Sequence, residues 1–335
     1  MKHLFFVHSP ITKLMAYQVI KEKDYDFKDV VFLIDRIKLD TSSKVKEYQF
    51  PFRIYPINDL EVSLYFYKNW KNLSQLNHFI QEITESQNFY FYATKAQSNY
   101  FYLVINNNKC EGYYFIEEGM AAYNEQYWHN KKKELYLRQL LYNLNFNGKV
   151  PSVKHFFDFA HSKYKGCFGL LDDAFKGFPN REILNLPFQK KDNLCNYKEI
   201  IVFDAALEFH YLSAEVLEKS IELLFQILVE KGIDKCHFKL HPAQKDISIG
   251  IIMSLILKFQ SQITFFKIPA EIILEEIAVS SLGSSFYICT SSIGLYAHIA
   301  GRKVYSWSSF VQKFIPDYLS KQSLPDSYQN NLTYL

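Results

Sequence analysis

The stretch "IIVFDAALEFHYLSAEVLEKSIELLFQILVEKGIDKCHFKL", residues 200–240, decides the fold class because it reads as a strand, a helix and a second strand. Residues 200–203 and 236–240 are short apolar runs of strand length, and residues 213–230 have helical periodicity. A helix between two strands is typical of a parallel crossover, since parallel strands cannot be joined by a tight turn. The stretch therefore predicts an α/β protein with a parallel sheet covered by helices on both faces.

The same alternation extends outward from this stretch in both directions. Further strands are expected at residues 3–8, 29–35, 88–93, 100–106, 112–118, 263–266, 286–289 and 304–307. Further helices are expected at residues 10–23, 58–83, 133–144, 247–259, from 270, 291–300 and 311–321, the last one shortened or kinked by Pro316. A segment rich in Pro, Asn and Lys, residues 178–196, has the composition of an interdomain linker. Two such halves predict twin Rossmann-like domains that face each other across a cleft.

Length and composition fit this two-domain expectation. The chain has 335 residues, of which 48% are hydrophobic and 22% are charged, as in globular proteins. A net charge of +3 is too small to predict a nucleic-acid partner. The lysines at 131–133 and 190–191 suit either a solvated face or an anionic membrane surface. The five cysteines are odd in number, widely spaced and without a CxxC pair, which favours a reducing compartment and predicts no zinc site.

The N-terminal run and the longest apolar run bear on the location of the protein. The apolar residues 4–7 stop at His8-Ser9-Pro10, which is typical of a first strand and not of a signal peptide. The longest mostly apolar run, residues 247–257, is shorter than the roughly 20 residues of a membrane span. We expect a cytoplasmic protein, either free or peripheral to the cytoplasmic face of the inner membrane.

Polar residues follow the expected strands at the edge where α/β proteins bind ligands. In the segment "YYFIEEGMAAY", Glu117, Glu118 and Gly119 come after an apolar strand. The two glutamates should point to opposite sides, and the glycine permits a sharp turn. A carboxylate facing the cleft, desolvated or near a like charge, would have a raised pKa and could act as a general base. The alternative is a solvated strand end.

Two groups after later strands could bind an anion or a nucleotide. His241 is held extended by Pro242, and its imidazole could contact a phosphate or act as an acid, or could merely adjoin a turn. Thr290, Ser291 and Ser292 open a helix whose free N–H groups could bind an anion, or one hydroxyl could simply cap it.

Three further candidates lie after other strands or at a helix start. Glu271, in the expected first helical turn after Pro269, could accept hydrogen bonds from a ribose or could only complement the helix dipole. His8 and Ser9 could reach the cleft from the first strand or could only begin the next helix. Asp204, at the end of residues 200–203, could line the same edge or cap a turn.

The order Glu-Glu-Gly, Lys-x-His-Pro and Ser-Ser resembles the signature of bacterial CMP-sialic acid-dependent sialyltransferases. The resemblance is closest to the lipooligosaccharide sialyltransferases of glycosyltransferase family 52 and more distant to the capsular polysialyltransferases of family 38. It implies a GT-B fold, no metal ion and no other cofactor. The matching residues run from 117 to 292.

The resemblance also implies roles for individual residues. Glu117 corresponds to the catalytic base and Glu118 to its neighbour, while His241 corresponds to the histidine that binds the departing CMP phosphate. The other implied donor-site residues are Lys239, Pro242, Glu271, Thr290, Ser291 and Ser292. Both acids of the first motif are glutamate here, where aspartate is common, which leaves open which carboxylate reaches the acceptor.

The implied activity is inverting transfer of sialic acid from CMP-sialic acid to a galactose-type hydroxyl of lipooligosaccharide, lipopolysaccharide or capsule. Alternatives are another CMP-activated nonulosonic acid as donor, or a non-catalytic nucleotide-binding scaffold of polysaccharide assembly. We expect an acceptor-side domain over residues 1–185, a donor domain over 186–310 and a tail, 311–335, that crosses back to the first domain. A homodimer is compatible with this expectation.

Overall fold

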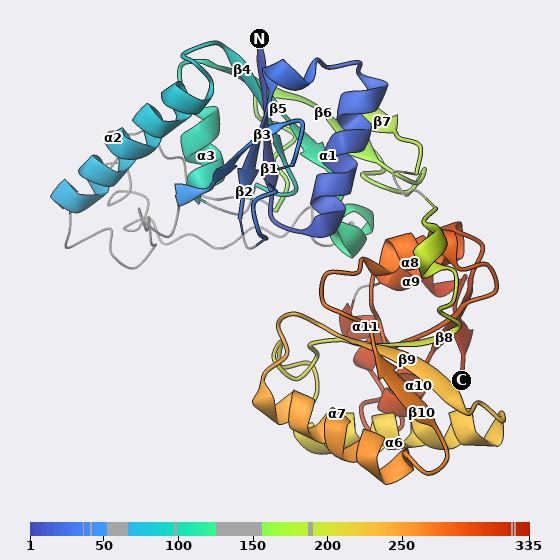
Figure 1. Cartoon of the computed structure of the whole chain (residues 1–335). Helices are drawn as coiled ribbons and strands as arrows, with labels where there is room; N and C mark the ends of the chain where they lie inside the picture. The colour runs from blue at the N-terminus through green and yellow to red at the C-terminus, as the bar shows by residue number, and fades with distance from the viewer. Residues whose placement is uncertain are drawn as a thin grey trace. The chain divides into compact units, whose positions relative to one another are not determined.

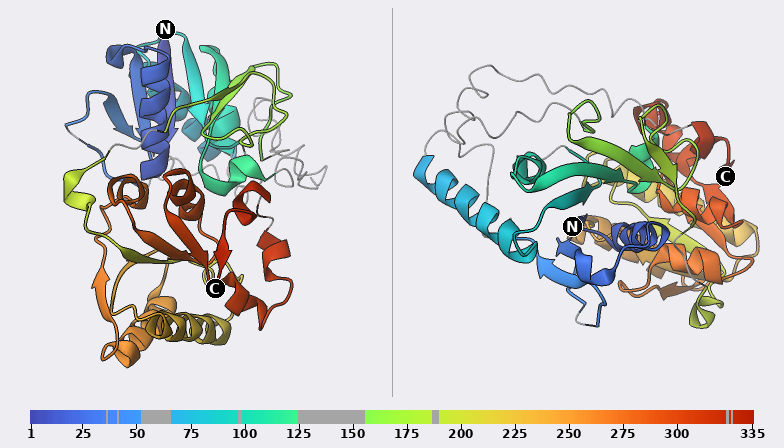
Figure 2. Two further views of the ribbon diagram at one scale, coloured as in Figure 1. Left: turned by 90° about the vertical axis from the view of Figure 1, so that its right-hand side faces the viewer. Right: turned by 90° about the horizontal axis from the view of Figure 1, so that it is seen from above.

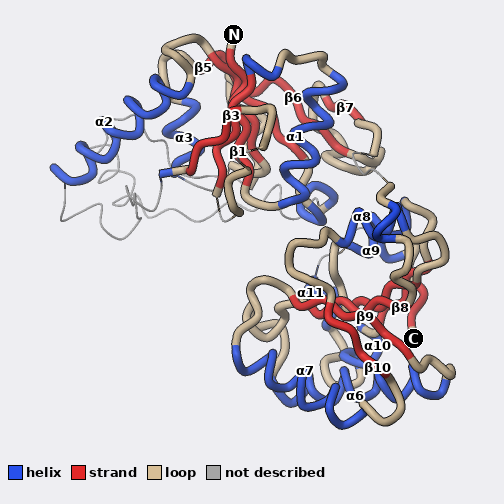
Figure 3. The backbone as a smooth tube through the Cα atoms, in the orientation of Figure 1, coloured by secondary structure: helices blue, strands red, loops and turns tan. Residues whose placement is uncertain are grey.

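The computed structural model describes residues 1–35, 37–40, 42–51, 66–96, 99–124, 156–186, 190–322, 324 and 326–335. The chain divides into two compact units, Met1–Pro187 and Phe188–Leu335. Each unit contains a parallel sheet with helices on both of its faces (Figures 1 and 3). The predicted class, an α/β protein with two Rossmann-like domains, is confirmed.

The first unit is built on a seven-stranded sheet. Its strands are β1 (Lys2–Val7), β2 (Val30–Ile34), β3 (Lys46–Gln49), β4 (Phe89–Ala93), β5 (Cys110–Ile116), β6 (Tyr164–Gly169) and β7 (Arg181–Ile183). They lie in the order β3-β2-β1-β4-β5-β6-β7, and all neighbours are parallel. The described helices are α1 (Pro10–Glu22), α2 (Phe66–Ile83) and α3 (Asn99–Ile105), with short 3₁₀ turns η1 (Phe27–Asp29) and η3 (Gly119–Tyr123). Helix α1 covers one face of the sheet, and α2 and α3 lie on the other (Figures 1 and 2).

Aromatic side chains form much of the interior of the first unit. The rings of Phe5 and Tyr92 stack at 4.0 Å between centroids, and Tyr92 stacks on Tyr114 at 5.0 Å. Tyr114 then contacts Phe168 at 5.5 Å, so four rings form a row across β1, β4, β5 and β6. Offset and edge-on ring pairs add to the stabilisation that burial of their area provides. The high aromatic content therefore has a packing role in this sheet.

The second unit is built on a six-stranded sheet. Its strands are β8 (Glu199–Phe203), β9 (Lys235–Leu240), β10 (Thr264–Lys267), β11 (Ser285–Ile288), β12 (Lys303–Ser306) and β13 (Thr333–Tyr334). They lie in the order β10-β9-β8-β11-β12-β13, and all neighbours are parallel. Its helices are α6 (Ala214–Glu230), α7 (Asp246–Phe259), α8 (Leu274–Ser280), α9 (Ile293–Ile299), α10 (Ser308–Gln312), α11 (Tyr318–Gln322) and α12 (Asp326–Gln329), with the 3₁₀ turn η4 (Asp192–Leu194). Helices α6 and α7 cover one face and α8 and α9 the other (Figure 1).

Both sheets follow one strand order. Numbered from its own first strand, each sheet reads 3-2-1-4-5-6, and the first sheet adds a seventh strand. This is the doubly wound order, in which ligands bind beyond the carboxyl ends of the strands where the winding reverses. The reversal lies between β1 and β4 in the first unit and between β8 and β11 in the second. These two edges are the positions to search for function.

One predicted strand is wrong. Residues 100–106, "YFYLVIN", have the aromatic and β-branched content of a strand, but residues Asn99–Ile105 form α3. Because β4 and β5 are parallel neighbours, the chain between them must cross over the sheet, and a helix is the compact way to do so. The requirement of the crossover overrides the local preference of these residues.

The remaining differences concern short elements and the tail. The prediction missed β3, β6, β7 and β13, and β7 lies within the stretch taken as a linker. The helix expected at 311–321 is divided into α10 and α11, and Pro316 lies between them. The expected helix at 133–144 and the expected helix start at Asn58-Asp59 lie outside the described residues. None of the helices in the described ranges combines the length and apolar character of a membrane span.

Candidate functional site

The carboxyl ends of β1 and β5 bring together side chains that are far apart in the sequence. His8 and Ser9 follow β1, Glu118 follows β5, and β4 lies between the two strands. Glu118 Oε1 lies 2.5 Å from His8 Nε2 and accepts a hydrogen bond of 3.1 Å from Ser9 Oγ. Ser9 is also the N-cap of α1, where its Oγ accepts from the Thr12 N–H at 3.2 Å. Parallel pairing thus places the predicted residues His8, Ser9 and Glu118 in one cluster.

Glu117 lies in a different environment from its neighbour. Its side chain is 0% exposed, and its Oε2 accepts a hydrogen bond of 2.6 Å from the backbone N–H of Leu170. Leu170 directly follows β6, so Glu117 joins the ends of β5 and β6 inside the domain. The two glutamates thus have different partners, Glu117 at the end of β6 and Glu118 at the end of β1.

Glu118 is the more accessible of the two carboxylates, with 27% of its side chain exposed. Burial alone would raise the pKa of Glu118, but the hydrogen bonds from His8 and Ser9 and the charges of His8 and Lys95 outweigh it. The pKa of Glu118 is therefore below its usual range. The expectation of a raised pKa at this strand end is wrong for Glu118, because the neighbouring groups are hydrogen-bond donors and cations.

Gly119 makes the turn that was predicted for it. Its φ of 59° lies in the left-handed region, which glycine adopts without steric cost. The residue starts η3 immediately after Glu118, whose own backbone is extended with φ −138° and ψ 94°. The chain therefore reverses directly beside the Glu118 carboxylate.

In the second unit, the ends of β8, β9 and β11 are joined by a chain of hydrogen bonds. The backbone N–H of His241 donates to Gln244 Oε1 at 2.9 Å, and Gln244 Nε2 donates to the Asp204 carbonyl at 3.1 Å. Asp204 Oδ2 accepts from the Thr290 N–H at 3.1 Å and also from the Ser291 hydroxyl. Gln244 was not predicted. Its signal in the sequence is an amide three residues after the histidine, which alone is weak.

His241 is exposed, and its ring is held in a defined orientation. Its Nδ1 accepts a hydrogen bond of 3.1 Å from the Ala243 N–H, so in the neutral ring the proton lies on Nε2. The ring meets Phe209 edge-on, with 6.0 Å between centroids. Desolvation lowers the pKa of His241, and the charge of Glu208 acts in the opposite direction. Its Nε2–H is a donor suited to an anionic oxygen.

The carboxyl group of Asp204, at this edge of the sheet, has a raised pKa. Burial raises its pKa to about 6, although the hydrogen bonds from Thr290 and Ser291 act to lower it. An anion bound at the Ser291 hydroxyl would lie near this carboxyl group.

The predicted serines lie before the helix and not within it. Helix α9 begins at Ile293, and Ser292 is its N-cap with helical φ and ψ and no side-chain capping bond. The Ser291 carbonyl accepts from Gly294 N–H at 3.0 Å and from the Tyr328 hydroxyl at 2.7 Å. Because Ser291 Oγ binds Asp204 and Ser292 makes no capping bond, helix capping does not explain the serine pair.

The surroundings of Lys239 and Glu271 differ from those that the sequence predicted. Lys239 Nζ donates to the carbonyls of Pro269, Ala270 and Ile272 at 2.6, 3.0 and 2.6 Å, so it holds the loop after β10. Glu271 is exposed in a turn of that loop and not in a first helical turn, because α8 begins only at Leu274.

Two other residues complete this edge. The first turn of α8 contains Glu275 and Glu276, and burial raises the pKa of Glu275 to about 7. Pro242 is exposed next to His241. The structure thus brings His241, Thr290 and Ser291 together through Asp204 and Gln244, and it gives Lys239 a structural contact. In the described part of the chain, no group of three or more His, Cys, Asp or Glu side chains could hold a metal ion.

Comparison with known proteins supports the fold. No protein-family model matches the sequence, and the comparison with curated proteins found no match either. The structure is similar to a protein from Listeria monocytogenes assigned as a UDP-N-acetylglucosamine 2-epimerase, with 11% identity, a TM-score of 0.53 and coverage of 96% of this chain and 89% of that one. It is similar to S. aureus MnaA bound to UDP, with 10% identity, a TM-score of 0.50 and coverage of 91% and 79%.

A third similar structure is UDP-GlcNAc 2-epimerase from Methanocaldococcus jannaschii in complex with UDP-GlcNAc and UDP. Its identity is 11%, its TM-score is 0.50, and the match covers 91% of this chain and 83% of that one. At such identities the likeness defines the fold, which is the two-domain GT-B architecture. Activity must be argued from the residues of this chain.

Proposed function

We propose that the protein is a GT-B glycosyltransferase that uses a nucleotide-activated sugar, and that its donor is CMP-sialic acid. The observation that carries the proposal is the cluster of His8, Ser9 and Glu118 at the carboxyl edge of β1 and β5. It supplies a partly exposed carboxylate at the edge where doubly wound sheets bind ligands. The sialyltransferase resemblance of the Glu-Glu-Gly, His-Pro and Ser-Ser motifs supplies the donor class. Two solved structures of the same fold contain UDP.

Glu118 is the proposed general base. Glu117, which the motif order favours, is fully buried and has its Oε2 engaged by Leu170. Glu118 keeps Oε1 on His8 and Ser9, and no hydrogen bond from the described residues reaches its Oε2. Its lowered pKa keeps the carboxylate ionised at neutral pH, so it can accept a proton there.

The edge of β8, β9 and β11 is the proposed site for the CMP phosphate. His241 offers Nε2–H, because its Nδ1 already accepts from Ala243. The hydroxyl of Ser292 lies after the neighbouring strand β11, and the Ser291 hydroxyl can donate to the phosphate when it leaves the Asp204 carboxyl. Hydrogen bonds from these groups would stabilise the charge that develops on the phosphate as CMP leaves.

The proposed reaction is a single displacement. An acceptor hydroxyl oxygen forms a bond to the anomeric carbon of sialic acid while the bond from that carbon to the phosphate oxygen breaks. The acceptor proton passes to the Glu118 carboxylate, and the electron pair of the broken bond remains on CMP. Attack on the face opposite the leaving group inverts the anomeric configuration. We place the acceptor, a terminal galactose of a bacterial surface glycan, on the first unit.

The base assignment is tested by two matched substitutions. Glu118→Gln should lower kcat by about 10²- to 10⁴-fold, because general base catalysis is lost, with CMP affinity unchanged. Glu117→Gln keeps an acceptor oxygen for Leu170 and should change kcat by less than about threefold. Rates are measured as CMP release from CMP-sialic acid with a galactoside acceptor. Loss of activity in a folded Glu117→Gln protein, with an active Glu118→Gln protein, would reverse the assignment.

The donor site is tested by CMP binding. His241→Ala, and Ser291→Ala combined with Ser292→Ala, should each weaken CMP binding by about tenfold, as expected for lost bonds to a charged group. Isothermal titration calorimetry measures this affinity directly. Substitution of Lys239 by Met is the informative comparison, because Lys239 contacts backbone carbonyls and should influence CMP only through the loop it holds. Unchanged affinity in both alanine variants would place the phosphate elsewhere.

Two alternatives give different results in the same assays. A transferase for another CMP-activated nonulosonic acid, such as legionaminic or pseudaminic acid, would release CMP from that donor and not from CMP-sialic acid. A non-catalytic scaffold would bind CMP with and without Glu118→Gln and would transfer to no acceptor.

A further inference from the structure

Helix α7 buries one apolar face and exposes three large apolar side chains on the other. Its inner side chains, including Ile252, Leu255 and Phe259, are buried in the core of the second unit. On the outer face, Ile247 is 70% exposed, Leu257 is 59% exposed and Met253 is 39% exposed. Large apolar side chains that lie together on a surface mark interaction sites. The outer face of α7 is therefore a surface that needs a partner.

Residues of matching type lie at equal distances on either side of Ile252 in the sequence of α7, and this symmetry indicates which partner fits the outer face. Asp246 and Lys258 lie six residues on either side of Ile252, and Ile247 and Leu257 lie five residues on either side of it. Gly250 and Ser254, both exposed, lie two residues on either side. When two copies of a helix pack antiparallel about a two-fold axis at this centre, residue i lies level with residue 504 − i of the other copy, and outward-facing residues of such a pair can contact each other. Charge then meets opposite charge, aliphatic meets aliphatic and small meets small.

We propose that α7 is the interface of a homodimer, in which the outer faces of two α7 helices pack antiparallel about a two-fold axis. Asp246 of each subunit pairs with Lys258 of the other, and Ile247 packs on Leu257 at both ends. Gly250 and Ser254 let the two backbones approach closely near the axis, where larger side chains would hold them apart. Asp246 has no ion-pair partner among the described residues, while Lys258 contacts Glu222 of its own chain at 2.5 Å.

The charges beside α7 favour a second copy over a membrane surface. The neighbouring helix α6 carries four glutamates, Glu215, Glu218, Glu222 and Glu230, and one lysine, Lys219. This acidic flank would repel anionic lipid headgroups. The outer face of α7 itself is neutral, since Asp246 and Lys258 balance each other. Self-complementary charge is the property that a two-fold interface requires.

Sedimentation velocity of the full chain tests the proposal. The unsubstituted protein should sediment as a dimer at micromolar concentration, and Leu257→Lys should weaken the dimer by at least about tenfold. Asp246→Lys and Lys258→Asp should each weaken it, because like charges then face each other, and the combined variant should recover the affinity. Glu218→Lys, on the exposed face of α6, is the control that should leave the dimer unchanged. A monomeric unsubstituted protein, or a double charge exchange without recovery, would overturn the proposal.

Cross-linking tests the register of the pair. In a Cys195→Ser background, Gly250→Cys mixed with Ser254→Cys and oxidised with copper phenanthroline should give disulfide-linked dimers. Either variant alone should give far fewer, because like positions would be separated by about 6 Å along the helix axis. Equal cross-linking in all three samples would contradict the antiparallel register. Binding to anionic vesicles that Leu257→Lys abolishes, without a dimer in solution, would identify a membrane surface as the partner instead.

Discussion

Glu117 and Glu118 are adjacent in the sequence and opposite in their environments. Glu117 is buried against Leu170, whereas Glu118 is partly exposed and paired with His8 and Ser9. The sequence placed a pair of acids at a strand end but could not choose between them, because alternation fixes that they diverge and not which one faces solvent. The choice depends on Leu170, which follows the unpredicted strand β6 and supplies the N–H for Glu117.

Asp204 makes anion binding at the second unit depend on pH. Its pKa of about 6 means that the carboxyl is ionised at pH 8 and mostly protonated at pH 5. We expect CMP affinity to increase as the pH falls through about 6, since the repulsion between Asp204 and the phosphate is then lost. Asp204→Asn should therefore raise CMP affinity at pH 8 by about three- to tenfold and flatten the pH dependence. Calorimetric titrations between pH 5 and pH 8 measure both effects.

His241 also gains a proton on acidification, so it needs a separate control. Its lowered pKa implies that this step falls below the ordinary histidine range. In Asp204→Asn the residual pH dependence should belong to His241 and to the CMP phosphate, whose second pKa is about 6, and His241→Gln should leave only the part that belongs to the phosphate. A pH profile that Asp204→Asn leaves unchanged would show that the carboxyl does not face the anion.

At the scale of elements, the sequence predicted strands and helices correctly where the spacing of the apolar residues and the length of the segment both indicated the same kind of element. Strands β1, β2, β4 and β5 and helix α1 of the first unit are found close to their expected positions. Helix α3 was mistaken for a strand, because its aromatic residues suit a sheet and only the parallel pairing of β4 with β5 requires a helix. The edge strands β3, β7 and β13 are two to four residues long, too short for a periodic signal.

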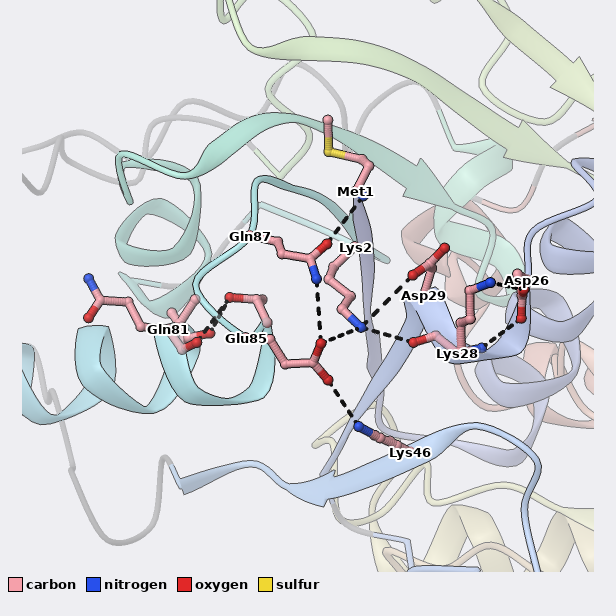
Figure 4. A network of polar contacts seen from close by, with 11 residues as sticks. Met1, Lys2, Asp26, Lys28, Asp29, Lys46, Gln81, Glu85 and Gln87 are labelled. Carbon is pink, nitrogen blue, oxygen red and sulfur yellow. Dashed lines mark hydrogen bonds and ion pairs between the residues drawn. The ribbon is translucent and has the colours of Figure 1, made fainter.

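A buried lysine joins the amino end of β1 to its neighbouring elements (Figure 4). Lys2 Nζ, on a side chain only 4% exposed, lies 3.1 Å from Glu85 and donates to the Lys28 carbonyl at 2.9 Å. It also lies 3.9 Å from Asp29. Lys2→Met should lower the free energy of unfolding by about 1–3 kcal/mol, because buried acceptors lose a charged donor. Urea denaturation of the full chain measures this change.

Lys46 provides the matched control for Lys2. It also pairs with Glu85, at 3.0 Å, but 58% of its side chain is exposed. Water replaces an exposed ion pair at little cost, so Lys46→Met should have a much smaller effect than Lys2→Met. If the two variants lost equal free energy of unfolding, burial would not be the reason that the Lys2 contacts stabilise the protein.

At the scale of the whole molecule, each unit has the features of an independent folding domain. The second unit, Phe188–Leu335, has its own six-stranded sheet and its own apolar core. The expected domain limits of 185 and 310 remain a prediction. Residues 311–335 contribute α11, α12 and β13 to the second unit, and β13 pairs with β12.

A fragment of residues 190–335 should therefore fold alone and bind CMP within about threefold of the affinity of the full chain. It should transfer no sugar, because Glu118 and His8 are absent. Circular dichroism during thermal unfolding reports on folding, and calorimetry reports on binding. The same fragment with His241→Ala is the control that should lose CMP. A folded fragment without CMP affinity would mean that the donor site needs residues of the first unit.

The sequence by itself determined the α/β class, the two Rossmann-like halves and the polar residues that follow β1, β5, β9 and β11. These are local properties, since hydrophobic period, helix caps and the residue after a strand are all read within a few positions of the chain. Only the tertiary structure decided that His8 meets Glu118, that Asp204 binds Thr290 and that Lys239 holds a loop. Those pairings join residues far apart in the chain. They exist because strand order, which no local pattern encodes, brings particular strand ends to the same edge of a sheet.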